Sequence, residues 1–333
     1  MPSNCQIYNP FMKHIILTLS LFLLPSCLGI LHSQNTIVEL PNSDKDTYSF
    51  TTSADGHLLY YTNKNHLTVF NLMNYEVINV FNIQVDSPVL SILVDPNTST
   101  LFLGTKSGKL VAVSKETGKL HFEKEYNSGS INALALTSDE RTFLIGCENG
   151  MVYMQSIEDE NTISEFYQHN KAITSIEVSK EKQLIAISSG DGSISLFGEP
   201  TYEWIDKLSV GKDWVRKVVI NDSKDRLLCV GDDGRLYEWN IANITKARLI
   251  NKNRVSRNWL LSLNIGSDEN VKCWGGLDHL LKVRTNFGTY RLKLKGPVLK
   301  AEFINSGSIQ VYIAVCILGN GIQIIPLKEM KFR

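Results

Sequence analysis

Two segments of the chain carry the residues best suited to bind a partner. Residues 212–217 and 253–259 each combine tryptophan with arginine, the side chains that most often anchor protein interfaces. We expect four of these residues to form a binding hot spot: Trp214, Arg216, Arg254 and Arg257. Trp259 falls on a predicted strand, so we expect it in the core rather than at the surface.

Catalytic chemistry is not indicated. The sequence contains no G-x-S-x-G elbow, no H-E-x-x-H helix motif, no phosphate-binding loop and no dinucleotide fingerprint. The cysteines after residue 33 are far apart and have neither C-x-x-C spacing nor a histidine nearby, which argues against zinc; they are Cys147, Cys229, Cys273 and Cys316. We therefore predict that the protein is not an enzyme and uses no cofactor, and that these cysteines are buried free thiols.

Charge is balanced overall but uneven along the chain. The 34 basic and 34 acidic residues cancel, which argues against electrostatic binding of nucleic acid. Residues 241–300, however, contain twelve basic and three acidic residues, a net charge of +9. This segment predicts a positive sector that docks an acidic protein segment, a polysaccharide or an anionic surface. A scattered, solvated face is the alternative, since successive strand residues point in opposite directions.

The first 33 residues have the order of a secretory signal peptide. Lys13 and His14 precede an uncharged run, residues 15–24, and small residues follow it. We predict cleavage after Ser33, with Met12 as an alternative start. The mature chain would be exported to the periplasm, the cell surface or the medium.

Two other fates remain open for this N-terminal segment. The sequence around Cys27 resembles a lipoprotein box, in which Cys27 would be lipidated, and the uncharged stretch could be a signal anchor. Pro25 argues against a continuous spanning helix. We expect no stable membrane span after processing.

A repeat of about 42 residues runs through the rest of the chain. A turn followed by an alternating apolar strand recurs with markers at positions 66, 108, 150, 192, 234, 279 and 321. Turns such as Asn149-Gly150 and Asp191-Gly192 provide the positive φ that a tight hairpin requires. A second register of strand starts, again 42 apart, falls at Val89, Ile131, Ile173 and Val215.

Four short strands per period indicate a propeller blade. The sequence therefore predicts an all-β, seven-bladed β-propeller of four-stranded antiparallel blades that occupies residues 34–330 as a single domain. The last period lacks a fourth strand, while residues 36–40 form a strand without a blade. We expect this N-terminal strand to close the last blade, and the closed ring to be a monomer.

Several blades resemble the WD-repeat (WD40-like) family. The fourth period has His169 and the run from Ser188 through Asp191 to Phe197, and the fifth reads Asp233-Gly234-Arg235-Leu236-Tyr237-Glu238-Trp239-Asn240. The resemblance assigns structural roles to His169, Asp191, Asp233 and Trp239. It implies a hydrogen bond between His169 and Asp191. Because Gly211 replaces the histidine of blade five and other blades lack it too, we expect packing alone to hold those blades.

The family resemblance favours a non-enzymatic scaffold that binds a protein partner through its loop faces. One period, residues 108–120, is similar to quinoprotein-like propellers, which include dehydrogenases and outer-membrane assembly scaffolds. A propeller hydrolase or lactonase with carboxylates in the channel is a further alternative. So is a truncated product of a longer gene.

Overall fold

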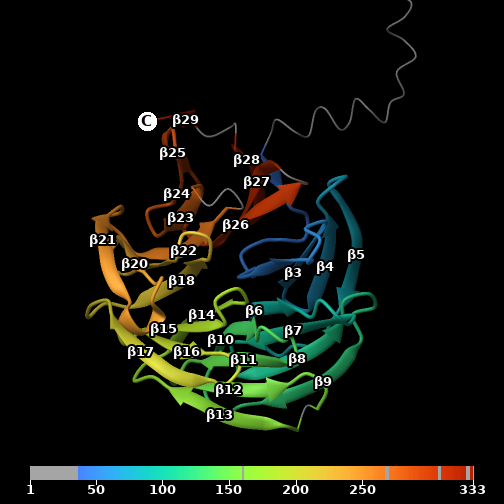
Figure 1. Cartoon of the computed structure of the whole chain (residues 1–333). Helices are drawn as coiled ribbons and strands as arrows, with labels where there is room; N and C mark the ends of the chain where they lie inside the picture. Colours follow the sequence, from blue (N-terminus) through green and yellow to red (C-terminus); the bar gives the residue numbers. More distant parts are fainter. Residues whose placement is uncertain (1–36, 160, 267–269, 307–308, 328–330, 333) are drawn as a thin grey trace, which may run out of the picture.

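The computed structural model describes residues 37–159, 161–266, 270–306, 309–327 and 331–332. Seven antiparallel sheets surround a central axis (Figure 1). The predicted all-β, seven-bladed propeller is confirmed. The predicted signal segment and its Cys27 lie outside the described residues.

Strands follow one another in chain order within each blade, and the first strand of the blade lies nearest the axis. The first four blades comprise β2 (Phe50–Thr52), β3 (Leu58–Asn63), β4 (His66–Asn71) and β5 (Glu76–Asn82); β6 (Val89–Val94), β7 (Thr100–Thr105), β8 (Lys109–Ser114) and β9 (Leu120–Glu125); β10 (Ile131–Leu136), β11 (Thr142–Cys147), β12 (Met151–Ser156) and β13 (Ile163–Gln168); and β14 (Ile173–Ser179), β15 (Leu184–Ser189), β16 (Ser193–Gly198) and β17 (Glu203–Ser209).

The last three blades follow the same order, with additions at the chain ends. They comprise β18 (Val215–Asn221), β19 (Arg226–Gly231), β20 (Arg235–Asn240) and β21 (Arg248–Arg254), with the 3₁₀ turn η2 (Ile244–Lys246) before β21; β22 (Leu260–Ile265), β23 (Lys272–Gly276), β24 (Leu280–Thr285), β25 (Gly288–Lys293) and β29 (Lys331–Phe332); and β26 (Val298–Ser306), β27 (Ile309–Ile317), β28 (Gly321–Pro326) and β1 (Val38–Glu39).

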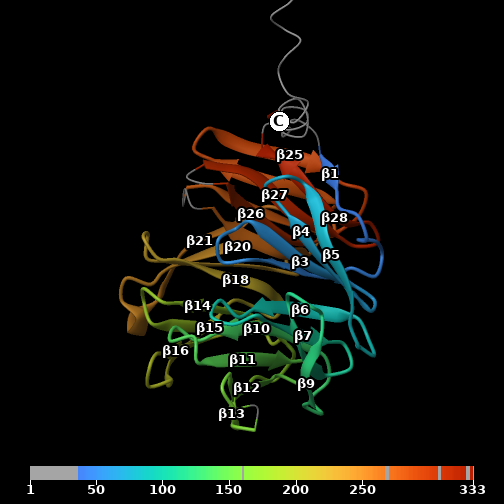
Figure 2. The same cartoon turned by 90° about the vertical axis from the view of Figure 1, so that its right-hand side faces the viewer.

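The two ends of the chain complete the ring. Strand β1 pairs antiparallel with β28, with Val38 opposite Ile324, and the Leu40 N–H donates to the Ile322 carbonyl at 2.8 Å. Both views show these strands side by side (Figures 1 and 2). The predicted closure of the last blade by the N-terminal strand is therefore confirmed. Strand β29 was not predicted, and it adds a fifth strand to blade six.

Apolar side chains that repeat with the blade period fill the space between blades. One such position is fully or almost fully buried in all seven blades: Tyr61, Leu103, Ile145, Ile187, Cys229, Trp274 and Cys316. Cys147, Cys229, Cys273 and Cys316 are buried free thiols, as predicted. Burial raises the pKa of the Cys147 thiol to about 12, so this cysteine stays protonated at neutral pH.

The marker turns hold the loop that leads into the next blade. The Gly192 carbonyl accepts the N–H groups of Val210 and Gly211 at 2.9 and 3.2 Å, and the Gly234 carbonyl accepts those of Val255 and Ser256 at 3.0 Å each. Gly192 has a φ of 84°, and a Cβ there would lie 2.2 Å from the Gly211 carbonyl oxygen. Glycine is needed at this turn because both the conformation and the close approach exclude a side chain.

The described part of the chain contains no helix long and apolar enough to cross a membrane.

We expect Gly192→Ala to lower the free energy of unfolding by about 2 kcal/mol or more, because alanine is strained at positive φ and its Cβ would push the next loop away. Urea unfolding measures the change. The matched control is Gly211→Ala on the other side of the same contact, where a Cβ meets nothing within 4 Å; it should change stability by less than about 0.5 kcal/mol. Equal losses in the two variants would contradict this description of the turn.

Candidate interaction rim

The candidate site lies where two innermost strands begin. The loop before β18 carries Trp214, and the loop before β22 carries Trp259. Strands β18 and β22 are adjacent around the axis, so both loops open on the same rim of the central channel. The marker turns of blades four and five anchor these loops, and the fold thereby brings segments 212–217 and 253–259 together.

Arg216 is the centre of this rim. Its guanidinium donates two hydrogen bonds to the Asp232 carboxylate, at 2.7 and 2.8 Å, and lies 4.4 Å from the ring centroid of Trp214 and 5.3 Å from that of Trp259. A bidentate arginine-carboxylate pair fixes the plane of the guanidinium, and cation-π attraction then orients both indoles. Asp232 thus neutralises the charge of Arg216 within the protein. The Arg216 side chain positions Trp214 and Trp259.

The expectation that Trp259 lies in the core is wrong. Strand β22 begins at Leu260, so Trp259 precedes the strand, and 47% of its surface is exposed. A shift of one residue in the start of a strand exchanges buried and exposed positions. The backbone of Trp259 is held by Gly276, where a Cβ would lie 2.0 Å from the Trp259 carbonyl oxygen, and the Leu277 N–H donates to that oxygen at 3.0 Å.

Glycines of the neighbouring sheets also make room for Trp214. A Cβ at Gly190 would lie 2.6 Å from the indole of Trp214, and one at Gly231 would lie 2.0 Å from its carbonyl oxygen. The indole therefore lies against the bare backbone of blade four. Asp232, as the partner of Arg216, and the exposed Trp259 are the residues of this rim that the sequence analysis missed. Gly231 and Gly190, which precede Asp232 and Asp191, were the available signal in the sequence, because a glycine at such a position indicates that another part of the chain packs closely against the backbone.

The four predicted hot-spot residues divide between two pockets. Trp214 and Arg216 line a cavity of about 460 Å³ at the mouth of the channel, together with Asn132, Leu261 and Leu299. Arg254 and Arg257 line a different pocket of about 560 Å³. The structure brings together the members of each pair but makes no single cluster of the four.

The channel below the rim contains carboxylates that are paired with lysines. Glu177 lies 3.6 Å from Lys217, and Glu302 lies 2.9 Å from Lys300. Burial raises the pKa of Glu177. In the residues that the structure describes, no three His, Cys, Asp or Glu side chains lie close enough to hold a metal ion. These ion pairs serve to compensate charge within the ring.

The hydrogen bond predicted within blade four is present. His169 Nδ1 lies 3.0 Å from Asp191 Oδ2, and both side chains are buried. Burial lowers the pKa of His169 below its ordinary value of 6.5. Burial opposes ionisation of Asp191 as well, but hydrogen bonds from Ser193 and His169 hold its pKa far below the ordinary value of 3.8. A neutral imidazole that donates a hydrogen bond to an ionised carboxylate is consistent with the lowered pKa of both side chains.

Packing alone does not hold the other blades, contrary to expectation. In blade six, Ser256 stands in the position of the histidine and donates to Asp278 at 2.9 Å. In blade two, Ser107 donates to Asp86 at 2.7 Å. Serine thus replaces the histidine in blade six. In blade two the arrangement is reversed, because Ser107 is in the marker turn and the carboxylate of Asp86 is in the loop. The family motif reveals neither arrangement.

Blade five fastens its turn with an aromatic hydroxyl. The Tyr237 hydroxyl donates to Asp233 at 2.6 Å, and its ring stacks on the buried Trp239 with centroids 5.7 Å apart. Burial raises the pKa of Tyr237, and the Asp233 carboxylate adds to this effect.

Comparison with known proteins supports the same architecture. A sequence model of the Pep3/Vps18/deep orange beta-propeller domain matches residues 38–208, just over half of the chain. Cilia- and flagella-associated protein 57 of Mus musculus is 24% identical over 199 residues, 57% of this chain and 15% of that protein. WD repeat-containing protein 55 of Rattus norvegicus is 24% identical over 188 residues, 52% of this chain and 47% of the relative. A homolog of the latter in Drosophila persimilis is 26% identical over 164 residues, 48% of this chain and 32% of the relative. The chain thus matches less than half the length of each of these relatives.

The pair formed by His169 and Asp191 makes stability depend on pH. The folded pKa of His169 is lowered, so the unfolded chain binds more protons as the pH falls through 6.5, and stability drops towards acid. We expect His169→Gln to cost about 1–3 kcal/mol at pH 7 and to flatten the dependence between pH 7 and 5, which is at most about 1.4 kcal/mol per pH unit for one proton.

Urea titrations at several pH values test this expectation. The exposed His121 provides the matched control, and His121→Gln should keep the slope of the wild-type protein. An unchanged slope in His169→Gln would show that this histidine does not couple stability to pH.

Proposed function

The chain belongs to the Pep3/Vps18/deep orange family of WD-repeat β-propellers, and from this premise we propose that it is a non-enzymatic scaffold that binds a partner protein at the rim between blades five and six. The observation that carries the proposal is the pair of indoles, Trp214 and Trp259, which the ion pair between Arg216 and Asp232 holds in place. The relatives matched by the chain include WD repeat-containing proteins, and rigid rings of this kind present many loops on one scaffold.

The physical state of Trp259 supports a binding role. A half-exposed indole leaves apolar area in water, and covering a large apolar side chain contributes about 1.5–3 kcal/mol. Trp259 is already oriented by Arg216, so a partner loses little side-chain entropy when it covers the ring. Tryptophan and arginine with a polar surround have the composition of an interface hot spot.

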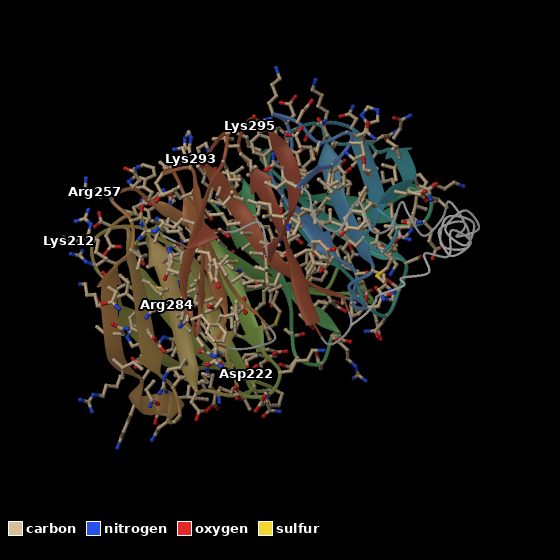
Figure 3. All side chains as sticks on the ribbon, turned by 90° about the horizontal axis from the view of Figure 1, so that it is seen from above. Lys212, Asp222, Arg257, Arg284, Lys293 and Lys295 are labelled. Atoms are coloured by element: carbon tan, nitrogen blue, oxygen red, sulfur yellow. The ribbon has the colours of Figure 1, made fainter. Side chains whose placement is uncertain are left out.

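The charge of the same region favours an acidic partner. Arg254 and Arg257 are exposed and shortly precede Trp259 in the chain, within the segment whose net charge is +9. Figure 3 places Lys212, Arg257, Lys293 and Lys295 along one side of the ring, and Arg284 and Asp222 on the other. We propose that the ring acts as a monomer, because one closed ring buries its own core, and that it binds its partner without a cofactor.

Substitution of both tryptophans tests the proposed function. We expect Trp214→Ala with Trp259→Ala to reduce partner capture from the native host at least tenfold, the equivalent of about 1.4 kcal/mol, while the ring stays folded. Quantitative mass spectrometry of affinity-purified complexes measures the loss. Trp204, which is 56% exposed on β17, provides the matched control. Capture that survives the double substitution but falls in Trp204→Ala would move the site to the outer edge of blade four.

We propose further that the mature protein is exported, on the strength of the signal-like order of residues 13–33. Intact-mass analysis of periplasmic, membrane, secreted and cytosolic fractions should find a soluble exported species that begins at Gln34. A lipidated species that begins at Cys27 would make it a membrane-tethered lipoprotein, and an uncleaved cytosolic chain would refute export.

A further inference from the structure

A second pocket, lined in part by the residues that precede Trp259 in the chain, contains three guanidinium groups. Arg254 comes from the end of β21, Arg257 from the loop before β22 and Arg291 from β25. We call this cluster the arginine pocket. It has a volume of about 560 Å³, and Val255 and Leu280 form apolar parts of its wall. Arg291 was not among the residues selected from the sequence, because it lies 34 positions after Arg257.

The charge at the base of the arginine pocket is already compensated. Asp278 accepts hydrogen bonds from Lys282 Nζ at 2.5 Å and from Ser256 Oγ at 2.9 Å. Lys282 and Ser256 are buried, and this carboxylate is therefore not available to neutralise the arginines. Four basic residues and one acidic residue line the pocket, which leaves a net charge of +3.

The arginines themselves are open to a ligand. Arg254 uses its Nε to donate to the Ser256 carbonyl at 3.2 Å, which orients its terminal nitrogens. Within the described part of the chain, neither the Arg257 nor the Arg291 guanidinium has a hydrogen-bond or ion-pair partner. All three side chains are exposed. Arg216 differs from them, because Asp232 already occupies its guanidinium.

We propose that the arginine pocket binds a run of Asp and Glu side chains in a linear segment of the partner protein, next to an apolar residue that covers Trp259. This inference rests on the proposed function of the rim and adds the chemistry of the bound segment. Guanidinium groups form paired hydrogen bonds with carboxylates. Trp259 is only two residues from Arg257, so one extended peptide reaches both subsites.

The size of the pocket favours several carboxylates over a single phosphate. A phosphate group fills the space of a few water molecules at about 30 Å³ each, and the pocket is many times larger. The three arginines come from two strands and a loop, so each guanidinium offers its own set of donors to a separate carboxylate. Charge complementarity of this kind also speeds encounter and makes binding sensitive to salt.

The test uses an array of twelve-residue peptides in which two to four Asp or Glu residues stand at varied distances from a Trp, Phe or Leu. The best binder is then titrated by fluorescence anisotropy in about 50 and about 200 mM salt. We expect Arg257→Gln with Arg291→Gln to weaken binding at least tenfold and to reduce the salt dependence. Arg284→Gln, on the other side of the ring, should bind like the wild type (Figure 3).

Other outcomes overturn the inference in distinguishable ways. If the double arginine variant captures the native partner as well as the wild type does, the rim binds protein but the arginine pocket does not. Tighter binding of the matched phosphothreonine peptide, or of a heparin oligosaccharide, would show that the arginine pocket prefers a phosphate or sulfate group to a run of carboxylates. If neither peptides nor native partner bind the wild-type protein, the proposed function fails as well. Far-UV circular dichroism confirms that each variant is folded.

Discussion

The backbone pairing of β1 with β28 joins the two ends of the chain, and the positions of all seven blades depend on it. The outer edge of blade seven is completed by the two residues of β1 and, just after the strand, by the N–H of Leu40 and the side chain of Ser43. A blade without this strand would expose the unpaired backbone of β28 to water and to other chains. Once the ring is closed, a period of 42 to 45 residues places each loop beside the next, and the rim between blades five and six has a defined geometry.

The rim combines charged side chains that form ion pairs within the protein with arginines that do not. Asp232 matches Arg216, and Lys282 matches Asp278, so these pairs give the site its shape. Partly buried pairs of this kind contribute specificity of geometry more than stability, because removal from water offsets much of their attraction. The arginine pocket remains positive because Lys282 already neutralises its one carboxylate, Asp278. The rim therefore binds through the arginines of the arginine pocket, which the internal ion pairs do not neutralise.

Much of the fold could be predicted from the sequence because it depends on local, repeated signals. Turn glycines and strand alternation recur in every period, and the unpaired N-terminal strand indicated the closure. The bond between His169 and Asp191 was predictable because both belong to one recognised motif. The contact of Arg216 with Asp232 could not be predicted, because it joins β18 to the turn after β19 and its geometry depends on the conformation of that turn. The exposure of Trp259 was missed through a shift of one residue, and β29 was missed because two residues carry no strand pattern.

The central claim is that Trp259 lies at the surface where the partner binds. A photo-crosslinking amino acid at position 259, introduced into the full chain in its native host, tests this most directly. Position 204 on β17 is the reference, because Trp204 is even more exposed than Trp259, at 56% against 47%. The account predicts one dominant protein adduct from position 259 and none from position 204. Adducts of equal yield and identity from both positions, or none from position 259 in cells where the partner is captured, would contradict it.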